Sequence, residues 1–116
     1  MISIKDEPVD IKNADGEWMT VVGKVLFDTG NTAPTGISEK LVHELGLKPD
    51  TSEEINVYGA GGTKVQCSGT VKTEVKVRDH VFPIKALVDL PTDEVDLLIG
   101  KDIIDTLIHL NYTFGE

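Results

Sequence analysis

Apolar and polar residues alternate along most of the chain, and this pattern predicts a mostly β domain. Alternating or continuous apolar runs bounded by turn residues are typical of strands. The pair Asp15-Gly16 is a hairpin-turn signal, and Gly23 is expected to interrupt the run that surrounds it. The expected strand segments, of which the fourth contains a glycine-rich turn, are residues 2–4, 9–11, 17–27, 55–77, 80–90, 95–100 and 108–114.

Two segments have helical spacing instead. In residues 37–47 the apolar positions recur three and four residues apart, Ser38 can cap the start, and Gly46 marks the end. Residues 101–107 are a second, shorter candidate. We find no internal repeat and no linker. The sequence therefore predicts a single domain over residues 1–116, mostly β, with one or two short helices.

Composition and charge exclude several classes of function. The 116 residues are 40% hydrophobic and 27% charged, which is ordinary for a soluble globular protein. A net charge of -9 argues against a nucleic-acid partner, because phosphate binding needs clustered Lys and Arg, and it disfavours anionic membranes. No apolar run approaches the roughly 18 residues of a membrane span, and residues 1–10 lack a signal-peptide pattern. The single cysteine, Cys67, excludes an intrachain disulfide framework. We expect a cytoplasmic protein without a membrane partner.

The candidate chemistry lies in the tripeptide Asp28-Thr29-Gly30. The apolar run Val25–Phe27 leads directly into it, so the carboxylate is expected at the edge of the core, where a charge needs partners. Gly30 would let backbone amides approach that carboxylate, and the Thr29 hydroxyl can lock the turn. Taken alone the tripeptide is a weak signal, because all three residue types are common in turns.

Four segments in a fixed order strengthen the signal. They are "VLFDTG", the helical "ISEKLVHELGL", the glycine-rich "YGAGG", and "DLLIGKDII". Together they resemble the retropepsin family of aspartic proteases, which includes the retroviral proteases and their single-domain cellular relatives. The resemblance covers nearly the whole chain, and the two ends are similar to the family's terminal strands. It implies a closed β-barrel, equivalent to half of an acid protease, that works as a symmetric dimer.

The resemblance also implies roles for individual residues. The catalytic set would be Asp28, Thr29 and Gly30. The glycine-rich hairpin would be a flap that closes over an extended peptide, as in strand addition. The residues implied to contact substrate are Asn31, Tyr58, Gly59, Ala60, Gly61 and Gly62. The residues implied to support the site without doing chemistry are Leu98, Ile99 and Gly100.

The chemistry of aspartic proteolysis predicts the partner. It needs two carboxylates that share one proton, one to activate a water and one to hydrogen-bond the scissile carbonyl. The chain has no second Asp-Thr-Gly or Asp-Ser-Gly. We therefore expect a homodimer that acts on peptide or protein substrates and has no metal and no cofactor. The histidines at 43, 80 and 109 lack metal-ligand spacing.

The chain departs from the family pattern beside the motif. Asn31 stands where the family has a small residue, and the loop over residues 31–36 is slightly longer than usual. Thr32 and Lys101 occupy the positions at which viral members pair an acid with an arginine between subunits. Two other interpretations stay open. One is a catalytically inactive retropepsin-fold domain used for binding or dimerisation, and the other is an unrelated β binding module with a chance Asp-Thr-Gly.

Overall fold

The computed structural model describes residues 2–3, 7–28, 34–52, 56–58, 64–66, 69–88 and 95–113. Within these ranges strands outnumber helices by eleven to two. The expectation of a mostly β fold with one or two short helices is confirmed. No helix in the described ranges has the length and apolar character needed to cross a membrane.

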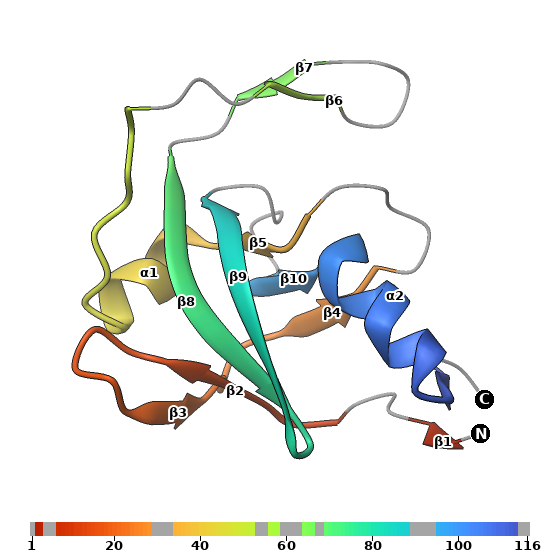
Figure 1. Cartoon of the computed structure of the whole chain (residues 1–116). Coiled ribbons are helices and arrows are strands. Elements are labelled where there is room, and N and C mark those ends of the chain that lie inside the picture. Colours follow the sequence, from red (N-terminus) through yellow and green to blue (C-terminus); the bar gives the residue numbers. More distant parts are fainter. Residues whose placement is uncertain are drawn as a thin grey trace.

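The largest element is a mixed seven-stranded sheet that curls into a half-barrel (Figure 1). Four strands at one side are antiparallel, whereas β9 pairs with β5, and β10 with β4, in parallel. In the described ranges the outer strands β3 and β4 do not pair with each other, so the sheet there is a half-barrel, and the expected closed barrel is not confirmed. In sheet order the strands are β3 (Trp18–Thr20), β2 (Val9–Lys12), β8 (Thr70–Val77), β9 (His80–Val88), β5 (Gly36–Ile37), β10 (Leu97–Ile99) and β4 (Val25–Phe27).

Two smaller strand pairs complete the β structure. The hairpin of β6 (Asn56–Tyr58) and β7 (Lys64–Gln66) lies apart from the main sheet in Figure 1. Near the two termini, β1 (Ile2–Ser3) pairs in parallel with β11 (Tyr112–Thr113). The expected segment 55–77 is therefore three strands, because β8 belongs to the main sheet.

Local turn chemistry explains the first hairpin. The Asn13 side-chain oxygen accepts hydrogen bonds from the backbone N–H groups of Asp15 and Glu17, both at 2.9 Å. Gly16 has a φ of 81°, a left-handed conformation that glycine adopts without strain. The predicted turn at residues 13–17 is confirmed, and so is the break at Gly23, which lies between β3 and β4.

Helix α1 (Glu39–Glu44) begins and ends where the sequence indicates. The Ser38 hydroxyl accepts a hydrogen bond from the Leu41 N–H at 3.1 Å, which satisfies one of the unpaired donors of the first turn. Gly46 follows the helix with a φ of 70° and donates its N–H to the His43 carbonyl. This is the left-handed residue that commonly ends a helix.

Helix α2 (Lys101–His109) is longer than the sequence predicts. The pattern predicts a change from helix to strand after residue 107, but the helix continues to His109 and only Tyr112–Thr113 form a strand. Its buried residues Ile103, Ile104 and Leu107 fix one face on the core, and packing of that face extends the helix by tertiary contact. Asn111, with a φ of 70°, then reverses the chain.

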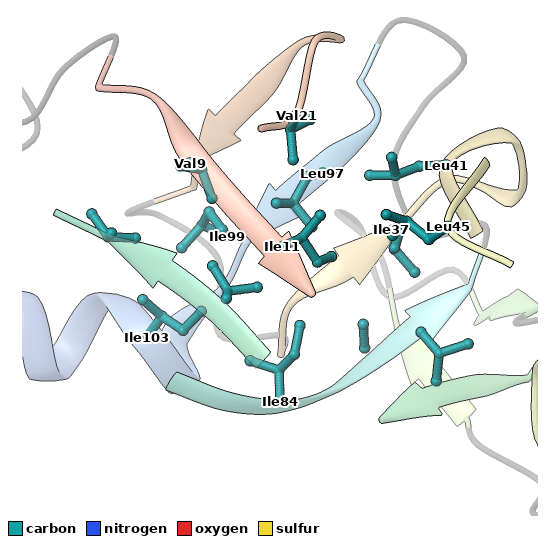
Figure 2. Packing of buried hydrophobic residues seen from close by; sticks show 14 of the residues in the cluster. Val9, Ile11, Val21, Ile37, Leu41, Leu45, Ile84, Leu97, Ile99 and Ile103 are labelled. Atoms are coloured by element: carbon teal, nitrogen blue, oxygen red, sulfur yellow. The ribbon is translucent and has the colours of Figure 1, made fainter. Parts of the chain in front are cut away.

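The core fills the concave side of the curled sheet (Figure 2). Along β8 the residues Val71, Val75 and Val77 are buried while intervening positions are more exposed, as the period of a strand requires. Strand β10 differs because all three of its residues are buried. A continuous apolar run is typical of a strand that is covered on both faces, and β10 lies directly beside the candidate site.

Candidate active site

Asp28 follows the last residue of β4, at the point where β4 and β10 stop pairing. The parallel register places Phe27 opposite Ile99, and the Asp28 N–H donates to the Ile99 carbonyl at 3.0 Å. Asp28 is half-buried, and Phe27 before it packs against the core. An acid at the edge of the core, with its backbone held by a neighbouring strand, is what the apolar run before it indicates.

The end of strand β10, which lies beside Asp28, links the site to helix α2. Leu98 pairs with Leu26 on one side and with Gly36 on the other, so β10 is held by two strands. Gly100 then precedes α2, and its carbonyl accepts hydrogen bonds from the N–H groups of Ile103 and Ile104. Leu98, Ile99 and Gly100 therefore join the end of β4 to the first turn of α2.

A buried hydroxyl lies next to this junction. Thr35 is 0% exposed, and its hydroxyl donates to Asp102 Oδ1 at 2.8 Å and accepts from the Gly100 N–H at 3.2 Å. The Thr35 N–H also donates to Asp102 Oδ1, at 3.1 Å, and the Thr35 carbonyl accepts from the Leu87 N–H at 3.0 Å. Buried polar groups are costly unless they are paired in this way.

Sequence reasoning did not identify Thr35 or Asp102. In the pattern, Asp102 is an acid in the first turn of a helix, a placement that the helix dipole already favours. Thr35 is one residue of an irregular loop that follows the motif. The signal in the sequence is an acid two residues after Gly100, shortly after an apolar strand. That signal does not indicate which residue the acid hydrogen-bonds.

Several of the predicted site residues lie outside the described ranges. They are Thr29, Gly30, Asn31, Gly59, Ala60, Gly61 and Gly62. Tyr58 is described only as part of the backbone of β6, where it pairs with Lys64. The predicted strands on either side of the glycines are found as β6 and β7, which pair antiparallel, and the predicted turn between them lies outside the described ranges.

Backbone hydrogen bonds hold the base of that hairpin, and the Val88 N–H donates to the Gly69 carbonyl at 2.9 Å. Asp50 and Thr70 exchange two backbone hydrogen bonds, at 2.7 and 2.9 Å. Gly69 has a φ of 135°, and a Cβ at this position would lie 2.8 Å from the Asp50 carbonyl oxygen. A side chain at residue 69 would therefore force apart the two segments that lead into β6 and out of β7.

The Asp50 side chain stabilises the same base. Its Oδ1 accepts from the Ser52 hydroxyl at 2.6 Å and from the Ser52 N–H at 2.9 Å, and these two bonds hold the pKa of Asp50 below its ordinary value of 3.8. The charges of Lys85 and Lys72 act in the same direction, more weakly. Because this pKa is lowered in the folded state, the contribution to folding is present above the ordinary pKa and is lost as the pH falls through the lowered value.

The histidines do not assemble a metal centre in the described ranges, where no group of three or more His, Cys, Asp or Glu side chains could hold a metal ion. His43 and His109 are exposed on different helices. His80 instead contacts the C-terminal strand, with its Nε2 3.1 Å from the Tyr112 hydroxyl.

Comparison with known proteins identifies the family. The sequence model of a family described as aspartyl protease matches residues 8–103, a range that includes Asp28, the β6–β7 hairpin and Asp102. No curated protein matches the chain. A crystal structure of a protein of unknown function from Legionella pneumophila subsp. pneumophila str. Philadelphia 1 is 14% identical, with a TM-score of 0.49 over 98% of this chain and 92% of that one. Because the family match spans most of its length, the chain belongs to an aspartyl protease family of the retropepsin-like clan.

Proposed function

We propose that this protein is an aspartic endopeptidase, which hydrolyses peptide bonds with a water molecule activated by the paired Asp28 carboxylates of a homodimer. The observation that carries the proposal is the position of Asp28 at the end of β4, with its N–H bonded to the Ile99 carbonyl. This acid lies within the range that matches an aspartyl protease family.

The mechanism follows from the chemistry of two adjacent acids. Two carboxylates a few ångströms apart cannot both ionise, so they hold one proton between them. The ionised Asp28 takes a proton from the water as the water oxygen attacks the scissile carbonyl carbon. The protonated Asp28 hydrogen-bonds the carbonyl oxygen and stabilises its developing charge. Proton transfer to the leaving nitrogen then completes cleavage of the C–N bond.

The homodimer supplies the second acid, because the chain carries one Asp-Thr-Gly. A twofold axis beside the catalytic turn would bring the two Asp28 residues together. One feature supports this arrangement. In the described ranges strand β4, which leads into Asp28, is an outer strand of the main sheet.

The substrate in this proposal is an extended peptide that lies between Asp28 and the β6–β7 hairpin. The hairpin backbone would bond the peptide main chain by strand addition, with Gly59, Ala60, Gly61 and Gly62 at its tip. Tyr58 and Asn31 would border the same groove. The backbone bonds between Asp50 and Thr70, and from the Val88 N–H to the Gly69 carbonyl, fix the base of the hairpin on the main sheet, so the peptide would lie against a hairpin of defined position.

The experiment that tests this function is cleavage of a mixed peptide library between about pH 4 and 7. We expect cleavage with an optimum on the acid side of neutral, because the pair of acids must hold one proton. Activity confined to alkaline pH would contradict the mechanism. Absence of cleavage at concentrations where a dimer is detected would favour a domain that serves only in binding or dimerisation.

Dilution tests the homodimer separately. We expect the rate of peptide cleavage to fall faster than in proportion to enzyme concentration, because the active site dissociates with the dimer. The measurement is the initial rate over a dilution series from micromolar to nanomolar, with the oligomeric state followed by sedimentation. Two copies joined by a flexible linker are the control, since an intramolecular site should give a linear dependence. A linear dependence for the unlinked chain while it sediments as a monomer would overturn the homodimer.

A further inference from the structure

Both ends of the loop that carries the catalytic motif are bonded to one short segment. At its entry, the Asp28 N–H donates to the Ile99 carbonyl at 3.0 Å. At its exit, Thr35 bonds to Gly100 and to Asp102. The entry and the exit are thus fastened to residues 99–102, so the position of this segment sets the separation of the two ends.

A single peptide group connects the two fastenings. The peptide bond between Ile99 and Gly100 is planar, so its carbonyl and its N–H point in fixed opposite directions. The carbonyl accepts from the Asp28 N–H, and the N–H donates to the Thr35 hydroxyl oxygen at 3.2 Å. The Thr35 hydroxyl therefore controls the orientation of the group that holds the backbone of Asp28.

Asp102 in turn fixes Thr35. One carboxylate oxygen, Oδ1, accepts from the Thr35 hydroxyl at 2.8 Å, from the Thr35 N–H at 3.1 Å and from the Ile103 N–H at 3.1 Å. Because the hydroxyl proton is directed at Asp102, a lone pair of the hydroxyl oxygen faces the Gly100 N–H. Asp102 as a whole is exposed, so its role is not to fill the core.

We infer that Asp102 is a positioning residue for the catalytic Asp28. It acts through Thr35 and the Ile99–Gly100 peptide and does not touch substrate. This inference rests on the proposed aspartic protease function for its effect on the rate. An acid in a first helical turn also stabilises the helix by its charge, but that role needs only the charge, whereas positioning needs an acceptor at the place of Oδ1.

Four substitutions separate these roles. Asp102→Ala removes both the acceptor and the charge, while Asp102→Asn keeps an oxygen acceptor and removes the charge. Asp102→Glu keeps the charge at the helix start but moves the acceptor. Asp105→Ala is the matched control, because Asp105 lies one turn later on α2, is exposed, and pairs with Lys101 at 2.9 Å.

We expect Asp102→Ala and Asp102→Glu to lower kcat by about 100-fold with little change in KM, since a displacement of about 1 Å at a catalytic group has that effect. Asp102→Asn keeps the oxygen acceptor and Asp105→Ala leaves Asp102 in place, so both should keep kcat within about threefold of wild type. A similar loss in all four variants would instead mean a general effect on stability. Circular dichroism at the assay temperature checks that each variant is folded. Wild-type kcat in folded Asp102→Ala, or equal losses in Asp102→Asn and Asp102→Ala, would overturn the inference.

Amide hydrogen exchange tests the same inference without activity. In Asp102→Ala the N–H groups of Asp28, Thr35 and Gly100 should exchange at least about tenfold faster, while that of the core residue Val75 should not change, because the loosening is local. Asp102→Asn should protect all of them. If the wild type cleaves no peptide but this exchange pattern is found, the proposed function fails and the positioning of Asp28 stands. If the wild type cleaves and Asp102→Ala changes neither exchange nor kcat, the inference fails and the function stands.

Discussion

Asp28→Asn is expected to lower kcat for peptide cleavage by about 10,000-fold, the upper end of what general acid–base groups contribute. In the homodimer the substitution replaces both acids at once. Two amides cannot accept the proton of the attacking water, and they hold no proton that the departing nitrogen could receive. Asn has nearly the same shape as Asp, and the Asp28 N–H that bonds to Ile99 belongs to the backbone, so the fold and the dimer should be kept.

The measurement compares initial rates for one peptide that the wild type cleaves, with the sedimentation of each protein recorded alongside. Asp10→Asn is the matched control. Asp10 is half-buried like Asp28, and it accepts a hydrogen bond from the Thr20 hydroxyl at 2.8 Å on strands that do not pair with β4 or β10. We expect its activity to equal that of the wild type. Retention of a tenth or more of the activity in Asp28→Asn would exclude this acid as the catalytic group.

The second large effect is expected on stability. Ile103→Ala should lower the free energy of unfolding by about 3 kcal/mol, because it removes a fully buried side chain and leaves a cavity. Ile103 is 1% exposed and lies in the core near Ile99 (Figure 2). The unfolding free energy of a domain is only about 5 to 15 kcal/mol. The loss therefore takes away a large part of the stability and loosens the contact of α2 with β10.

Ile108→Ala is the control for this substitution. Ile108 lies in the same helix but is 51% exposed, so little apolar area and no cavity are at stake. Both substitutions gain the same small helix propensity of Ala over Ile. The difference between their losses of unfolding free energy therefore isolates the effect of burial. Urea denaturation of both variants gives the two free energies. Equal losses of unfolding free energy would show that the buried face of α2 does not pack against the core as it does in the structure.

The elements of this fold that the sequence predicts well are those that local chemistry specifies. Asp15-Gly16 predicts its hairpin because glycine tolerates the left-handed turn, and Ser38 and Gly46 predict α1 because they satisfy the ends of a helix. The alternation of valines predicts β8. The candidate catalytic acid is found in the same way, as an acid and a glycine directly after a short apolar run.

The sequence predictions are wrong where contacts with distant parts of the chain decide the conformation of a residue. Residues 108 and 109 follow a pattern compatible with a strand, but they continue α2, whose buried face is already fixed on the core. The curl of the sheet is likewise a property of all its strands together. A window of a few residues contains neither the neighbouring face that covers a segment nor the strand that pairs with it, so periodicity leaves both open.

By itself the sequence determined the β-rich class with one or two short helices, the family resemblance and the acid on which the proposed chemistry rests. Only the tertiary structure decided that β4 pairs with β10, so that the Asp28 N–H meets the Ile99 carbonyl. It also decided that Thr35 is buried against Asp102, although the two are 67 residues apart. The physical reason is that an isolated acid or threonine has no preferred partner until burial removes water from around it and makes an unpaired polar group costly.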